Sequence, residues 1–126
     1  MNDEAPSVAL SAATKIYGSA DAEVRALDNV TIAFPRGQFT AVMGPSGSGK
    51  STLLNCMAGL DRLTSGTVEI GGVDLRDLSD RELTILRRTR LGFIFQSFNL
   101  LPALTARENI TYPLDLSRSR VDPQWF

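Results

Sequence analysis

The sequence predicts an α/β fold in which a partial parallel sheet with helices follows an amino-terminal antiparallel β subdomain. Apolar runs at 39–43 and 91–95 are typical of buried parallel strands. A helical pattern follows the first run, and alternating segments at 8–16, 24–34 and 67–70 are bounded by turn residues. With 126 residues, of which 43% are hydrophobic and 21% charged, we expect one globular domain at most.

In the amino-terminal part of the sequence, a polar tail, two irregular positions within predicted strands and a turn mark the expected elements. Residues 1–6 are polar and predict a disordered tail, so the domain is expected over 7–126. The alanines at 12–13 weaken the alternation of the first strand, and the turn formers at 28–29 predict a kink in the second. The Pro-Arg-Gly-Gln segment at 35–38 is a tight turn that leads into the first apolar run.

Helix signals place the remaining elements. Residues 51–58 carry an apolar face, and Gly59 is suited to ending that helix. Ser79 and Glu82 match a capping box, which predicts a helix that runs to about Arg88. A short helix is expected near 106–110, among the prolines of the last part of the chain.

A phosphate-binding loop is the most informative motif. Residues 44–51 read Gly-Pro-Ser-Gly-Ser-Gly-Lys-Ser and fit the pattern G-x-x-x-x-G-K-[ST], the Walker A motif of P-loop NTPases. Glycines let backbone N–H groups wrap a phosphate chain, Lys50 supplies a charge for the β- and γ-phosphates, and the Ser51 hydroxyl can bind Mg²⁺. The alternative is a flexible Gly/Ser linker, but linkers rarely connect a buried strand to an amphipathic helix. The motif therefore predicts binding of a nucleoside triphosphate.

Composition excludes several classes of function. Thirteen basic and fourteen acidic residues give a net charge of −1, which argues against a nucleic-acid partner. No apolar run approaches the ~18 residues that span a bilayer, and no signal peptide opens the chain. The single cysteine, Cys56, is expected to be a small core residue rather than a redox group. We therefore expect a soluble cytosolic protein.

The sequence resembles the ATP-binding-cassette (ABC) ATPases that drive membrane transporters, over roughly residues 8–110. Three stretches carry the resemblance: Val-Arg-Ala-Leu-Asp-Asn-Val at 24–30, the phosphate loop and its helix at 43–55, and Phe-Gln-Ser-Phe-Asn-Leu-Leu-Pro at 95–102. Within the family, it is most similar to the ATPase subunits of lipoprotein-releasing and macrolide-export systems. A GTPase is a poorer match, because the Asn-Lys-x-Asp guanine motif is missing, and a kinase is a poorer match, because no acceptor site is evident in the sequence.

The resemblance assigns roles to particular positions. Tyr17 would stack on adenine, although a tyrosine at a strand end can simply fill a core edge. Gln96 would help hold Mg²⁺ and the attacking water, and residues 98–104 would either face a permease or pack locally. The implied catalytic residues are Lys50 and Gln96, and the implied metal ligands are Ser51 and Gln96. The implied ATP-binding residues are Tyr17, Gly44, Pro45, Ser46, Gly47, Ser48, Gly49, Lys50, Ser51 and Thr52.

The resemblance also implies a function and partners. It implies an ATP-hydrolysing subunit that binds ATP and Mg²⁺, forms a head-to-tail homodimer, and lies in the cytoplasm against the inner face of the cell membrane. There it would drive export through an integral-membrane permease subunit. The family's Ser-Gly-Gly-Gln signature, its strand ending in Asp-Glu and its histidine are not found. We therefore expect an amino-terminal part, truncated before the signature motif, that cannot hydrolyse ATP alone; the alternative is a non-catalytic nucleotide-binding remnant.

Overall fold

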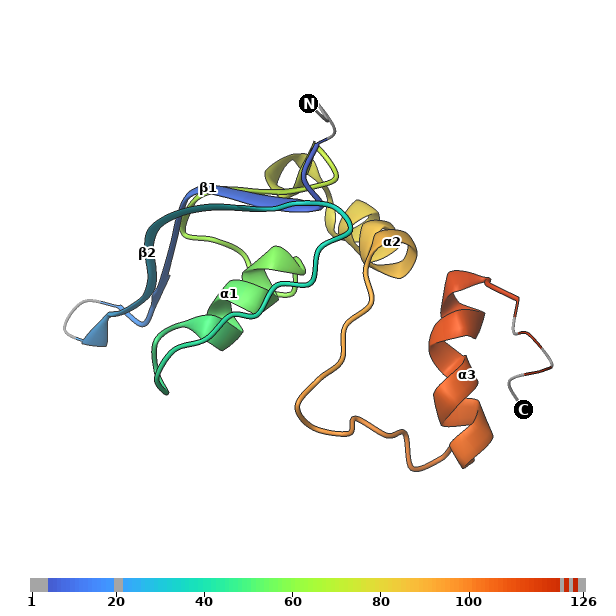
Figure 1. The fold of residues 1–126 in the computed structure, drawn as a ribbon. Coiled ribbons are helices and arrows are strands. Elements are labelled where there is room, and N and C mark those ends of the chain that lie inside the picture. The colour runs from blue at the N-terminus through green and yellow to red at the C-terminus, as the bar shows by residue number, and fades with distance from the viewer. Residues whose placement is uncertain (1–4, 20–21, 121, 123, 125–126) are drawn as a thin grey trace. The chain divides into compact units, whose positions relative to one another are not determined.

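The computed structural model describes residues 5–19, 22–120, 122 and 124 (Figure 1). Most of the predicted tail at 1–6 lies outside these residues. The chain divides into two compact units, Met1–Leu83 and Thr84–Phe126, which are described separately below. No helix among the described residues is both long enough and apolar enough to cross a membrane.

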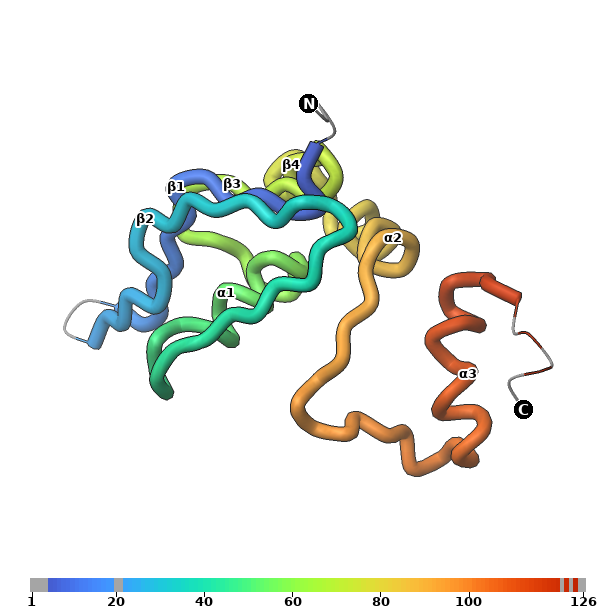
Figure 2. The backbone as a smooth tube through the Cα atoms, viewed as in Figure 1, coloured from blue at the N-terminus to red at the C-terminus, as the bar shows by residue number. Residues whose placement is uncertain are grey.

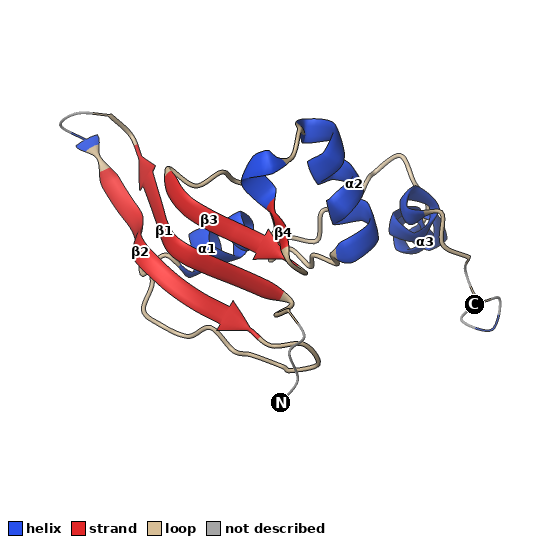
Figure 3. Ribbon diagram, turned by 90° about the horizontal axis from the view of Figure 1, so that it is seen from above, coloured by secondary structure: helices blue, strands red, loops and turns tan. Residues whose placement is uncertain are grey.

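The first unit contains a four-stranded antiparallel sheet in the order β2-β1-β3-β4, which Figures 2 and 3 show. The strands are β1 (Val8–Tyr17), β2 (Val24–Phe34), β3 (Ser65–Ile70) and β4 (Val73–Asp74). Val8 pairs with Phe34 on one side and with Ile70 on the other, so β1 is a central strand. The predicted antiparallel β subdomain is confirmed.

β1 and β2 are both irregular at the positions where the sequence departs from alternation. Ala12 and Asn29 have φ angles of 48° and 50°, a conformation that is uncommon outside glycine. The backbone N–H groups of these two residues are hydrogen-bonded to side chains. Ala12 N–H donates to Thr31 Oγ1 at 2.9 Å, and Asn29 N–H donates to Thr14 Oγ1 at 3.0 Å. The kink predicted at 28–29 is therefore confirmed, and β1 carries a β-bulge between Ser11 and Thr14.

Helix α1 (Lys50–Met57) packs against one face of this sheet (Figures 1 and 3). Its Cys56 is 1% exposed and burial raises the pKa of its thiol, as expected for a core residue. Gly59, with a φ of 63°, follows the helix where the sequence predicted its end. The core is formed by buried apolar side chains from the sheet, from α1 and its C-cap residue, from η2 (Leu75–Asp77) and from α2 (Asp80–Arg90): Leu10, Ala13, Leu27, Cys56, Ala58, Val68, Ile70, Leu75 and Leu83.

The strands predicted at 39–43 and 91–95 were wrong, because both segments are irregular in the structure. Phe39, Met43 and Ile94 are 99%, 88% and 97% exposed. A strand forms only when a neighbouring strand supplies a hydrogen-bonded ladder, and β propensity mostly reflects packing in that context. Neither segment has such a neighbour among the described residues, so their apolar composition does not make them strands.

The division between the units falls within helix α2 (Asp80–Arg90), which follows the short 3₁₀ helix η2 (Leu75–Asp77). The predicted capping box at its start is confirmed. Glu82 N–H donates to Ser79 Oγ at 3.4 Å, and Ser79 N–H donates to Glu82 Oε2 at 2.8 Å. These bonds satisfy backbone donors that the helix itself leaves unpaired.

The second unit contains α3 (Ala106–Ser117), which is longer than the helix predicted at 106–110. A capping box that the sequence analysis missed begins it: Glu108 N–H donates to Thr105 Oγ1 at 3.3 Å, and Thr105 N–H donates to Glu108 Oε2 at 2.7 Å. Pro113 lies inside the helix, so it does not end α3 as a proline often does.

We predict that Ser79→Ala lowers the free energy of unfolding by about 1 kcal/mol, because the Glu82 N–H loses its side-chain acceptor. The measurement is urea unfolding followed by circular dichroism. Ser79→Thr is the matched control, since threonine retains the hydroxyl at this position. Equal stability of the alanine and threonine variants would show that the capping bond contributes nothing measurable.

Candidate functional site

In the segment that matches the phosphate-loop motif, backbone carbonyl groups surround the ammonium group of Lys50. The Lys50 ammonium donates to the carbonyl oxygens of Gly44 and Pro45, each at 2.7 Å, and lies 3.4 Å from Ser48 Oγ. The Ser48 hydroxyl also donates to Pro45 O at 2.7 Å. The loop therefore brings one positive charge and several backbone groups together in an exposed turn.

Helix α1 begins at this loop and directs its amino-terminal N–H groups toward it. Gly49 is the N-cap residue and provides no side-chain cap, while Leu53 N–H donates to Gly49 O at 2.8 Å. The first-turn N–H groups of Lys50, Ser51 and Thr52 have no acceptor within the helix. Such a helix start attracts anions through these donors and through the helix dipole.

Gly49 also fixes the loop to the sheet. Its φ is 90°, and a Cβ atom at this position would lie 2.3 Å from the carbonyl oxygen of Ala26 in β2. Only glycine combines this backbone conformation with so close an approach. The glycine that the motif requires at position 49 therefore has a structural cause, which is the close approach of the loop to β2.

Tyr17 lies at the end of β1 and is held beside α1. Its hydroxyl donates to Asp61 Oδ2 at 2.6 Å, and the other carboxylate oxygen of Asp61 accepts from Lys15 Nζ at 2.6 Å. The hydrogen bond to Asp61 raises the pKa of the Tyr17 phenol, while a side-chain hydrogen bond with Thr52 opposes that rise. The structure thus brings Tyr17 next to the first turn of α1, where the phosphate loop ends.

Lys15 and Asp61 were not identified in the sequence. The hydrogen bond from Lys15 is the largest cause that lowers the pKa of Asp61, and the same bond raises the pKa of Lys15. Lys15 Nζ also lies over the Tyr17 ring, 4.8 Å from its centroid. These residues are 46 positions apart, so no local pattern in a single sequence indicates the pair.

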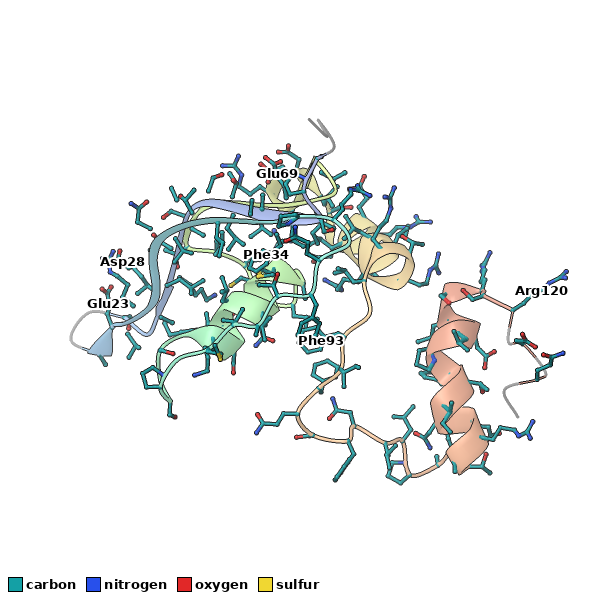
Figure 4. All side chains as sticks on the ribbon, in the orientation of Figure 1. Glu23, Asp28, Phe34, Glu69, Phe93 and Arg120 are labelled. Atoms are coloured by element: carbon teal, nitrogen blue, oxygen red, sulfur yellow. The ribbon has the colours of Figure 1, made fainter. Side chains whose placement is uncertain are left out.

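Gln96 belongs to the second unit, in an exposed bend. Its assigned place beside the phosphate loop remains a prediction. Nearby in the same unit, Phe93 and Phe95 form a tilted ring pair with centroids 4.5 Å apart (Phe93 is labelled in Figure 4). Phe98, Leu100 and Leu101 are exposed at 94%, 66% and 43%.

The oxygen groups of the candidate site suit Mg²⁺ chemically. Magnesium prefers oxygen ligands, and it usually takes one or two from protein while phosphates and water supply the others. The Ser51 side chain is exposed in the first turn of α1, next to Lys50. A hydroxyl at this place is the kind of single ligand that a metal bound to phosphates requires.

A comparison with protein families settles the classification. The ABC transporter family model matches residues 27–125. The chain belongs to the ABC transporter family. The family assignment made from the three sequence stretches is confirmed.

Relatives within the ABC transporter family include export and release systems. The chain is 50% identical over 101 residues to the uncharacterized ABC transporter ATP-binding protein MJ0796 of Methanocaldococcus jannaschii, covering 80% of this chain and 43% of that protein. It is 44% identical over 118 residues to the lipoprotein-releasing system ATP-binding protein LolD of Anaeromyxobacter dehalogenans, covering 94% and 49%. It is 47% identical over 108 residues to the macrolide export ATP-binding/permease protein MacB of Hyphomonas neptunium, covering 86% and 17%. The chain spans less than half the length of each of these relatives.

Solved ABC cassettes confirm the predicted fold class. A dimeric post-hydrolysis state of the ATP-binding cassette MJ0796, bound to ADP and Pi, matches with a TM-score of 0.84 and 44% identity. The match covers 94% of this chain and 51% of that chain. A second dimeric structure of the same cassette has a TM-score of 0.85. The fold therefore resembles that of an ABC ATPase, although segments 39–43 and 91–95 have no strand pairing among the described residues.

Proposed function

We propose that this chain is the ATP-binding part of an ABC transporter, which couples ATP binding and hydrolysis to export through a partner permease. The observation that carries the proposal is that the Lys50 ammonium, at the start of α1, donates hydrogen bonds to the carbonyl oxygens of Gly44 and Pro45. ABC family membership and the resemblance to MacB and LolD support the transport role.

The site residues have distinct proposed roles. Residues 44–52 wrap the phosphates of ATP, and Lys50 neutralises charge on the β- and γ-phosphates during transfer. Ser51, together with Gln96, holds Mg²⁺, which neutralises phosphate charge when bound. Tyr17 stacks on the adenine ring, with its phenol anchored at Asp61. Gln96 positions the attacking water.

The proposed assembly is a head-to-tail ATPase homodimer that lies in the cytoplasm against the inner face of the cell membrane and contacts an integral-membrane permease. The dimeric cassette structures support the dimer, and the printed name of MacB, an ATP-binding/permease protein, supports the membrane partner. The exposed apolar residues Phe98, Leu100 and Leu101 are the proposed contact surface for the permease.

Sequencing the gene beyond the codon for Phe126 tests this proposal. An open frame that encodes a Ser-Gly-Gly-Gln signature, an Asp-Glu strand and a histidine would support the hydrolysing transporter subunit. A stop codon would instead favour a nucleotide-binding protein without catalysis. In either case we expect the 126-residue chain by itself to show no steady ATP turnover. Turnover that disappears in Lys50→Ala would contradict this expectation.

We predict that Tyr17→Ala weakens binding of ATP more than binding of inorganic triphosphate, because only ATP presents a base to the ring. Loss of one base–aromatic stack corresponds to about 1–3 kcal/mol. Isothermal titration calorimetry with both ligands measures the difference. Equal losses for the two ligands would remove the stacking role from Tyr17.

A further inference from the structure

The carboxylate of Asp61 links the proposed base-binding residue to the helix that carries the phosphate loop. Asp61 accepts from the Tyr17 hydroxyl and from Lys15 Nζ, one on each oxygen and both at 2.6 Å. Its own N–H donates to Asn55 O in α1 at 3.3 Å, next to the 2.9 Å bond from Leu60 N–H to the same oxygen. The Tyr17 ring is thereby tied to α1 through a single residue.

Lys15 fixes the carboxylate in turn. Its ammonium donates to Asp61 Oδ1 and to the Arg62 carbonyl at 2.7 Å, and its side chain is only 13% exposed. Hydrogen bonds between ionised groups are roughly twice as strong as neutral ones. Asp61 therefore has a charged partner on one oxygen and the phenol on the other, which restricts rotation of the carboxylate.

The same lysine determines which face of the Tyr17 ring is available. Lys15 Nζ lies over the ring, 4.8 Å from its centroid. That face is covered by a cation, so a flat base can stack only on the opposite face. Tyr17 as a residue is 39% exposed, so part of it remains accessible.

We propose that Asp61, held in place by Lys15, is a positioning residue that orients the Tyr17 ring for stacking on adenine. It therefore sets the part of ATP affinity that depends on the base. This inference rests on the proposed nucleotide-binding function. ATP binds with its base at Tyr17 and its phosphates at the start of α1. A Tyr17 ring that is already tied to α1 loses less conformational freedom on binding than a free ring would.

Two variants separate positioning from stacking. Asp61→Ala removes the acceptor, whereas Tyr17→Phe retains the ring and removes only the hydroxyl. By calorimetry with Mg²⁺ present, we expect each to weaken ATP about three- to tenfold while inorganic triphosphate changes by less than about twofold. The double variant is expected to lose no more than the larger single loss, because both changes break the same contact.

A second readout does not depend on any ligand. In a Tyr112→Phe background Tyr17 is the only tyrosine, so ultraviolet absorbance reports titration of its phenol alone. Asp61 raises the pKa of this phenol, and Asp61→Ala is expected to return it toward its ordinary value. Retention of the raised pKa in Asp61→Ala would overturn the inference, because the contact would not exist in solution.

The ligand titrations distinguish failure of the proposed function from failure of the proposed role of Asp61. If the unaltered protein binds neither ATP nor triphosphate, the proposed function fails, and the inference fails with it. If the unaltered protein binds both ligands but Asp61→Ala weakens them equally, the inference alone is overturned, and Asp61 has only a structural role. Unchanged ATP affinity in both Asp61→Ala and Tyr17→Phe would overturn it as well.

Discussion

Replacing Lys50 with alanine is expected to weaken ATP binding by about 1.5–3 kcal/mol, which corresponds to roughly a 10- to 150-fold rise in Kd. The Lys50 ammonium donates hydrogen bonds to the carbonyl oxygens of Gly44 and Pro45, so it lies against the turn at 44–49. Its removal takes one charge-assisted contact from the bound phosphates. It also removes the bonds to Gly44 and Pro45, so the loop loses part of its internal order.

The matched control is Arg90→Ala, which removes one positive charge from the exposed last turn of α2. Calorimetric titration with ATP should separate the two variants, because each loses one unit of positive charge but only Lys50 belongs to the phosphate-loop motif. Circular dichroism must show that Lys50→Ala remains folded. Unchanged affinity in a folded Lys50→Ala protein would mean that the loop does not bind the phosphates.

The features predicted correctly from sequence are those fixed by a few neighbouring residues. The capping box of Ser79 and Glu82 needs only a hydroxyl and a carboxylate three positions apart. The turn that precedes α1 was likewise predicted from its motif, and its Gly49 has a φ of 90°, a conformation that favours glycine. The pairing of β1 with β2 follows from alternation and an intervening turn, because a hairpin joins segments that are close in sequence. The pairing of β1 with β3, in which Val8 meets Ile70, joins segments that are distant in sequence.

Apart from the local capping box of Thr105 and Glu108, the features that sequence reasoning missed depend on distant partners. Segments 39–43 and 91–95 have the composition of strands, yet a strand requires a neighbour that composition does not provide. The Lys15–Asp61 ion pair joins the end of β1 to the loop after α1, and it exists only because both elements pack together. Tyr17 was identified through its resemblance to a family position, whereas its anchor at Asp61 required coordinates.

Gly66→Ala is expected to lower the free energy of unfolding by about 2–5 kcal/mol. Gly66, the second residue of β3, has a φ of +87°, a conformation that costs an L-residue roughly 1–2 kcal/mol. A Cβ atom there would also lie 2.3 Å from the carbonyl oxygen of Ala12 and 2.7 Å from the Cα of Ala13. Forcing this overlap apart adds about 1–3 kcal/mol, because both neighbours are backbone of the central strand.

Gly37→Ala separates the two contributions. Gly37 has a φ of +68°, but a Cβ atom there has no neighbour within 4 Å, so this variant measures the cost of backbone strain alone. Urea unfolding of both variants should therefore show the larger loss for Gly66→Ala. Equal losses would mean that the β-bulge of β1 shifts freely to admit a methyl group.

The position of Gly66 connects this stability effect to the candidate site. The bulge that it contacts precedes Thr14, whose carbonyl accepts from Thr64 N–H at 2.9 Å, and Ile16 N–H donates to Thr64 Oγ1 at 2.9 Å. Those bonds set the path of β1 up to Tyr17. A Gly66→Ala protein that still folds should therefore lose ATP affinity through the base while retaining affinity for inorganic triphosphate. If Gly66→Ala instead weakened binding of inorganic triphosphate as much as binding of ATP, the substitution would have altered the phosphate loop. β1 would then not determine the position of Tyr17.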